Sequence, residues 1–246
     1  ICYNQNIMKR NESKFRVVNL INLLINLRSI SKRILDVKPH EAKILDSKKH
    51  ILIIGDSSAV GIGSSSPETT IAGMIEKDIP SISITNKGIS GLKIIDMAQS
   101  AYSFPVESYD AIFLFIGAND IATFQSMKKI EISLRIVIKK LLKLSPKVVM
   151  AHGGNFGVLP LFPWPLNQIY SIRTRKIRDV FVKLSHELNV IYVDMYTTIE
   201  NFPYTINGEP VYTSLDYAFH PNDLGYKLWY EKIKDTGIIE ELKTPL

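Results

Sequence analysis

Four separate segments of this sequence carry the side-chain types that acyl transfer by a serine requires. That chemistry needs a hydroxyl on a tight turn, a base to take its proton, a group that orients the base, and donors aimed at the oxyanion. Ser57 stands in Gly-Asp-Ser directly after a short apolar run. Gly91 and Asn119 follow two later runs, and His220 stands in His-Pro-Asn near the end of the chain. These segments predict a serine-dependent hydrolytic site.

The residue types suggest a role for each member of the site. Ser57 is the candidate nucleophile, His220 the general base and Asp216 the carboxylate that orients the imidazole. The candidate oxyanion donors are the Ser57 N–H, the Gly91 N–H and the Asn119 amide. A residue without Cβ lets its backbone approach the reacting carbonyl, and an amide donates regardless of pH.

Each segment alone is also typical of a turn or a helix cap. The order of the four segments carries the prediction, since Gly91, Asn119 and His220 follow Ser57 by 34, 62 and 163 residues. No group of cysteines could bind zinc, because Cys2 is the single cysteine. Thiol catalysis and a cysteine-based metal site are therefore not expected.

Alternating apolar runs and amphipathic stretches predict the framework that must position these residues. Short β-branched runs, typical of buried strands, alternate with stretches of helical periodicity, and this pattern favours a parallel sheet covered on both faces. The expected strands are Ile51–Ile54, Ser81–Thr85, Ala111–Ile116, Lys147–Ala151 and Val190–Val193. The expected helices are Thr70–Asp78, Leu92–Tyr102, Lys128–Leu144, Ile172–Leu188 and Asp223–Ile233. In open parallel sheets, ligands bind beyond the carboxyl ends of the strands, where the candidate residues lie.

The motifs resemble those of the SGNH hydrolase superfamily, the GDSL esterases and lipases, whose four blocks supply Ser, Gly, Asn and His in this order. The resemblance covers roughly residues 50–235, and residues 55–63 (Gly-Asp-Ser-Ser-Ala-Val-Gly-Ile-Gly) match the first block closely. It implies a flavodoxin-like three-layer α/β/α fold with a five-stranded parallel sheet, ester substrates, no cofactor, Ser57 as nucleophile and His220 as base. It also implies Gly91 and Asn119 in the oxyanion hole. Segment 157–166 is similar to that of uncharacterised bacterial members.

The last block departs from the family pattern. The family places its acid three residues before the histidine, where this chain has Tyr217, and the nearest acid, Asp216, lies four residues before His220. Two alternatives therefore stay open: a Ser-His-Asp triad, or a dyad in which a backbone carbonyl orients the ring.

An irregular stretch with three prolines, Gly153–Leu166, follows the fourth strand. Its apolar side chains would be exposed unless they border an acyl site or pack under the loop. We consider both alternatives, and in the first Phe162 and Trp164 contact the substrate.

Charge is distributed unevenly along the chain. The net charge is +6, but residues 1–50 carry 11 Lys and Arg against 4 Asp and Glu, while the remainder carries 19 against 20. The body therefore has no overall basic field, which disfavours nucleic-acid binding. We predict a basic N-terminal helical arm over residues 1–48 and a hydrolase domain over residues 49–246.

Helical spacing of apolar residues between positions 17 and 27 predicts an amphipathic helix in the arm. The apolar run is about half the roughly 20 residues that cross a bilayer. The helix either packs on the body or lies on an anionic membrane surface, giving a peripheral membrane contact. Because the chain starts at Ile1, an upstream signal or anchor is kept as an alternative. Localisation, cytoplasmic or membrane-associated, and oligomeric state stay open.

Rival functions differ in the motifs they need. The sequence does not support a phosphate-binding function, because no Gly-Lys-Ser/Thr motif occurs. It does not support an α/β-hydrolase either, because the required Gly-x-Ser-x-Gly motif is absent. A non-catalytic binding module on the same fold remains an alternative. Among enzymes, the substrate is a small-molecule or lipid ester or, alternatively, an O-acetyl group on a carbohydrate.

Overall fold

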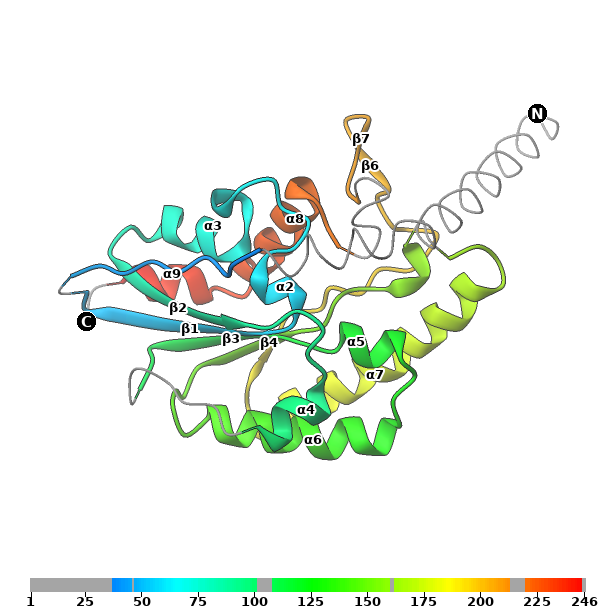
Figure 1. Ribbon diagram of the computed structural model, residues 1–246, viewed down its shortest axis with the longest axis horizontal. Helices are drawn as coiled ribbons and strands as arrows, with labels where there is room; N and C mark the ends of the chain where they lie inside the picture. Colours follow the sequence, from blue (N-terminus) through cyan, green and yellow to red (C-terminus); the bar gives the residue numbers. More distant parts are fainter. Residues whose placement is uncertain (1–36, 46, 101–107, 160–161, 213–219, 245–246) are drawn as a thin grey trace.

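A parallel β-sheet forms the centre of the computed structural model, which describes residues 37–45, 47–100, 108–159, 162–212 and 220–244 (Figure 1). Its five strands have the order β2-β1-β3-β4-β5, and every neighbouring pair is parallel. The predicted five-stranded α/β architecture is therefore confirmed. The strands are β1 (Lys49–Gly55), β2 (Ile82–Gly88), β3 (Ala111–Phe115), β4 (Val148–Ala151) and β5 (Ile191–Tyr192).

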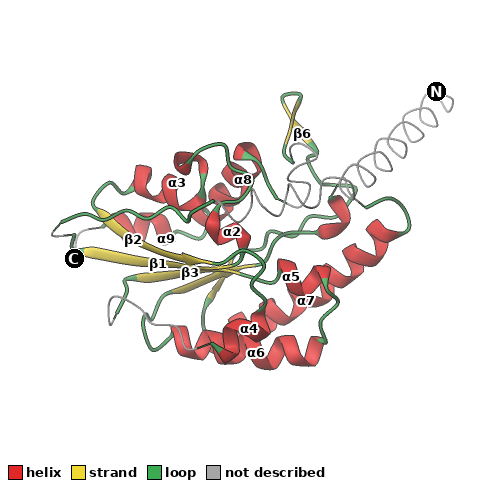
Figure 2. Cartoon of the chain, in the orientation of Figure 1, coloured by secondary structure: helices red, strands yellow, loops and turns green. Residues whose placement is uncertain are grey.

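Helices cover both faces of the sheet, as Figure 2 shows in red against the yellow strands. Alternate residues of β1 point to opposite faces: Ile51 and Ile53 join one buried cluster with α3, α8 and α9, whereas Leu52 and Ile54 join another with α4, α6 and α7. The two clusters make the three layers. The helices are α3 (Ile71–Asp78), α4 (Ile94–Gln99), α6 (Met127–Leu141), α7 (Leu166–Leu188), α8 (Asp223–Lys234) and α9 (Ile238–Lys243).

Several shorter elements were not expected from the sequence. Helix α2 (Ser57–Val60) follows β1, α5 (Ala118–Ala122) follows β3, and β6 (Thr205–Ile206) and β7 (Glu209–Pro210) form a hairpin. The hairpin turn is Asn207-Gly208, and both residues have positive φ angles, as a type I′ turn requires. Helix α9 was also missed. Two 3₁₀ turns, η1 (Pro67–Thr69) and η2 (Phe156–Val158), complete the elements.

The start of α7 differs from the sequence prediction. We expected the helix to begin at Ile172, but it begins at Leu166, directly after Pro165. Periodicity failed here because the buried side of the first turns is polar, formed by Asn167 and Ser171, while the apolar residues face solvent. A prediction based on the spacing of apolar residues therefore detects only the later turns of α7.

The predicted N-terminal arm falls mostly outside the described residues, which begin at position 37. Beyond that point the chain runs along the outer edge of the sheet, where Ala42 and Ile84 form an antiparallel bridge. In the part of the chain described, no helix is long and apolar enough to cross a bilayer.

Candidate active site

Ser57 lies at the carboxyl end of a central strand, on the first residue of α2. The turn that presents it depends on Gly55, whose φ angle is +142° and whose Cβ, if present, would collide with the Phe115 carbonyl oxygen. The next residue, Asp56, caps α2 by accepting a hydrogen bond from the Ser58 N–H at 2.9 Å. The strand-turn-helix geometry thus holds the Ser57 side chain at the edge where the other strands also end.

His220 lies beside Ser57. The distance from its Nε2 to the Ser57 Oγ is 2.8 Å, a hydrogen bond across 163 residues of sequence. Gly63 permits this approach, because a Cβ there would lie 2.9 Å from the His220 Cβ and 2.4 Å from the Pro221 carbonyl oxygen. Burial lowers the pKa of His220 to about 4, which keeps the imidazole neutral and able to accept a proton near pH 7.

Asp216 lies outside the described residues, so its relation to His220 stays a prediction. Among the residues that the structure describes, no carboxylate forms a hydrogen bond or ion pair with the His220 ring.

Gly91 and Asn119 occupy turns after the two neighbouring strands. Gly91 lies in the turn after β2, with a φ angle of +82°, and Asn119 lies in the first turn of α5 after β3. The Asn119 Nδ2 donates to the Leu92 carbonyl oxygen at 3.1 Å, so one amide N–H remains. In the described part of the chain, neither the Ser57 N–H nor the Gly91 N–H donates a hydrogen bond. These N–H groups are the candidate oxyanion donors, and that role stays a prediction.

Two buried carboxylates connect these turns, and no pattern in the sequence indicated their partners. Asp56 also accepts from the Ala118 N–H at 3.3 Å, which links the turn of Ser57 to the start of α5. Asp120 accepts from the Ile94 N–H at 3.0 Å, which links α5 to the start of α4. Burial raises the pKa of each carboxyl to about 6. Asp56 caps its own helix α2, whereas Asp120 accepts from the first N–H of α4, a contact set by packing between distant segments.

Phe162 and Trp164 occupy different environments. Phe162 is buried with its ring stacked on Tyr170 at a centroid distance of 4.0 Å, whereas Trp164 is 78% exposed. Phe162 therefore packs under the loop, and a contact of either side chain with substrate stays a prediction.

His152 is a buried histidine at the end of β4. Its ring lies between Phe181 and Tyr192, with centroid distances of 5.5 and 6.0 Å, and neither ring nitrogen has a partner among the described residues. Burial lowers its pKa to about 4. A neutral, packed imidazole is therefore the stable form in the folded protein.

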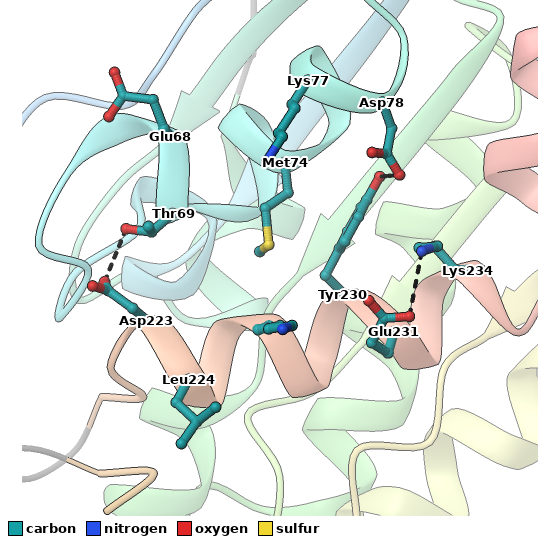
Figure 3. A pocket seen from close by; sticks show the side chains of 11 residues that line it. Glu68, Thr69, Met74, Lys77, Asp78, Asp223, Leu224, Tyr230, Glu231 and Lys234 are labelled. Atoms are coloured by element: carbon teal, nitrogen blue, oxygen red, sulfur yellow. Dashed lines mark hydrogen bonds and ion pairs between the residues drawn. The ribbon is translucent and has the colours of Figure 1, made fainter. Parts of the chain in front are cut away.

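A cavity of about 510 Å³ lies between α3 and α8 (Figure 3). Both acidic and basic side chains line it, and at one end Thr69 donates to Asp223, the first residue of α8, at 2.8 Å. Neither Ser57 nor His220 lines this cavity. The lining residues are Glu68, Thr69, Met74, Lys77, Asp78, Asp223, Leu224, Lys227, Tyr230, Glu231 and Lys234.

Comparison with protein families gives a match over more than half of the chain. The model of the GDSL-like lipase/acylhydrolase family matches residues 53–228, a range that contains all four of the motifs described above. No curated protein sequence matches the chain.

Solved structures share the fold at low sequence identity. A lipolytic protein of the G-D-S-L family from Veillonella parvula is 20% identical, with a TM-score of 0.55 over 76% of this chain and 97% of that chain. An extracellular lipase from Streptomyces rimosus is 15% identical, with a TM-score of 0.60 over 76% and 99%. A catalytic mutant of an acetylxylan esterase from Geobacillus stearothermophilus is 19% identical, with a TM-score of 0.52 over 77% and 95%. At these identities the likeness establishes the fold.

Proposed function

The chain belongs to the GDSL-like lipase/acylhydrolase family, and from this premise we propose that it hydrolyses carboxylic esters through an acyl-enzyme on Ser57. The observation that carries the proposal is the 2.8 Å hydrogen bond between Ser57 Oγ and His220 Nε2. A hydroxyl that donates to a neutral imidazole is an activated nucleophile, because the base can take the proton as the oxygen attacks.

Acylation follows from this pair. Ser57 Oγ attacks the ester carbonyl carbon while its proton passes to His220 Nε2, and the carbonyl oxygen becomes an oxyanion. The Ser57 N–H, the Gly91 N–H and the second N–H of the Asn119 amide stabilise that charge. The tetrahedral intermediate then collapses, the protonated imidazole gives its proton to the leaving oxygen, and the alcohol departs.

Deacylation uses the same groups in reverse. A water molecule attacks the acyl carbon while His220 takes its proton, and the imidazole then returns a proton to Ser57 Oγ as the acid leaves. Each turnover thus restores the starting protonation states and consumes one water molecule. The low pKa of His220 leaves the base neutral at the start of both half-reactions.

We propose small carboxylic esters or lipid esters as the substrate class. Fold neighbours include a lipase and an esterase active on acetylated mannans. O-acetylated carbohydrate is therefore the second class to test. Asp216 is proposed as the acid of the triad.

Labelling with a fluorophosphonate probe tests the function directly. The probe should modify the wild-type protein and leave Ser57→Ala unmodified, whereas a non-catalytic module would leave both unmodified. A matched control is Ser133→Ala, which removes a buried hydroxyl from α6 and should label like the wild type. A panel of p-nitrophenyl esters from acetate to palmitate, assayed beside an acetylated xylan, then identifies the substrate class.

A further inference from the structure

Large apolar side chains project into solvent at the beginning of α7. Leu166, Ile169 and Ile172 are 40%, 44% and 55% exposed, and Trp164, just before the helix, is 78% exposed. We name these four side chains the α7 ridge. Residues three apart share one side of a helix, so the ridge is continuous. Single exposed apolar residues are ordinary on protein surfaces, but a contiguous group marks an interaction site.

Buried polar contacts fix the orientation of this part of the helix. Asn167, Ser171 and Thr174 face the interior, where Asn155 Nδ2 donates to Ser171 Oγ at 3.1 Å and the Phe156 N–H donates to Thr174 Oγ1 at 3.2 Å. Rotating the helix to bury the ridge would break both hydrogen bonds inside the protein, which is costly. The solvent exposure of the ridge is therefore built into the fold.

The sequence around the ridge is strongly basic. Residues 164–178 contain four Lys and Arg and no Asp or Glu. Lys176 and Arg175 are exposed within one turn of Ile172, and Arg173 lies over the ring of Phe124, which is 51% exposed beside the ridge. Apolar side chains flanked by cations match the chemistry of an anionic lipid surface.

We propose that the α7 ridge docks the protein on an anionic lipid surface, with Trp164 at the level of the headgroups and the aliphatic side chains at the acyl boundary. Tryptophan favours this interface, and Lys176 and Arg175 would face lipid phosphates. Figure 1 shows the first turns of α7 extending past the carboxyl edge of the sheet, away from the rest of the body. Four partly exposed side chains offer less area than the roughly 800 Å² per partner of a stable protein interface, which favours lipid over protein.

Fluorescence of Trp164 tests the docking in the full chain. The sequence has two tryptophans, and Trp229 is 9% exposed, so Trp229→Phe leaves Trp164 as the single reporter. Its emission should be solvent-like in buffer and should shift to the blue with vesicles of phosphatidylglycerol and phosphatidylcholine. Because no tryptophan precedes position 164, binding through the N-terminal arm alone gives no such shift. Fluorophosphonate labelling of Ser57 without vesicles, a separate readout, reports the proposed function independently.

Substitutions identify the contributions of the apolar and basic groups. Ile169→Ser/Ile172→Ser should weaken vesicle binding by about ten-fold or more, and Lys176→Glu by at least about five-fold at low salt. Ile132→Ser/Ile136→Ser, which changes two exposed apolar residues of α6, is the matched control and should bind like the wild type.

Three outcomes would overturn the proposal. The first is a Trp164 emission that vesicles do not shift. The second is an emission already blue-shifted in buffer, which would assign the ridge to another segment of this chain or to a second copy. The third is equal binding to vesicles of phosphatidylcholine alone, which would remove the role of anionic lipid.

Discussion

The Asp223 carboxylate accepts a hydrogen bond from the backbone N–H of Ser65 at 2.7 Å, across 158 residues of sequence. The hydroxyl of Thr69 donates to the same carboxylate at 2.8 Å. Burial alone would raise the pKa of Asp223, but these hydrogen bonds outweigh it and lower the pKa. Because Asp223 lies three residues after His220, the contact ties the segment of the proposed base to the loop that follows Ser57.

Asp223→Ala should therefore reduce kcat by about ten- to hundred-fold with little change in KM, because a displaced imidazole loses its alignment with Ser57 Oγ. Asp223→Asn keeps an acceptor oxygen and should recover most of the activity. The matched control is Asp235→Ala, which removes an exposed carboxylate at the other end of α8. Loss of thermal stability with an unchanged kcat would assign Asp223 a structural role alone.

Asn119→Ala should lower kcat by roughly 10²–10³ with KM nearly unchanged, as expected when one oxyanion donor is lost. The side chain also donates to the Leu92 carbonyl, so unfolding by denaturant must be measured alongside the kinetics. A rise in KM with kcat intact would instead indicate that Asn119 binds the ground state.

His152 should make stability depend on pH. Its pKa is about 4 in the folded protein against about 6.5 when unfolded, so its contribution is complete above pH 6.5 and is lost as the pH falls toward 4. Between pH 7 and 5 this amounts to about 2 kcal/mol. Asp56 and Asp120 act oppositely, since their raised pKa values add stability as the pH falls through 6.

Comparing the wild type with His152→Leu isolates the contribution of this histidine to the pH dependence of stability. His152→Leu removes both unpartnered nitrogens, so its free energy of unfolding, measured in urea at pH 7 and pH 5, should decline less than that of the wild type. His186→Leu changes an exposed histidine of α7 and serves as the control. An equal decline in the free energy of unfolding of wild type and His152→Leu between pH 7 and pH 5 would contradict the prediction.

The strands and the location of the site could be predicted because both depend on local pattern. Runs such as Ile51–Ile54 are buried on both faces, and polar residues directly after them must gather at one edge of a parallel sheet. The contacts from Asp223 to Ser65 and from Asp120 to the Ile94 N–H could not be predicted in this way. They depend on side-chain packing between segments far apart in the chain, and a local sequence pattern does not indicate which segments pack together.

The beginning of α7 could not be predicted for a different reason. Asn167 and Ser171 are buried there while Leu166 and Ile169 are exposed, which reverses the pattern on which helix prediction relies. The exposed apolar side chains that prevented prediction of these helical turns are the same side chains that we propose to dock on lipid.

Asp216 provides the last prediction, because its effect on the pKa of His220 distinguishes a triad from a dyad. Among the described residues, burial alone acts on the His220 ring and lowers its pKa to about 4. A carboxylate from Asp216 at the ring would raise that pKa by favouring the imidazolium. We expect the triad. The acid limb of kcat/KM should then lie clearly above pH 4 in the wild type and move down toward 4 in Asp216→Asn.

In the triad, Asp216→Asn should also reduce kcat strongly, approaching the roughly 10⁴-fold loss found when an amide replaces the orienting carboxylate of a serine triad. In a dyad, a backbone carbonyl orients the ring, so the loss stays below about ten-fold and the acid limb does not move. Both proteins must be folded and carry a probe-reactive Ser57. A small loss together with an unchanged limb would remove Asp216 from the catalytic residues and leave it as a turn residue that caps its own backbone.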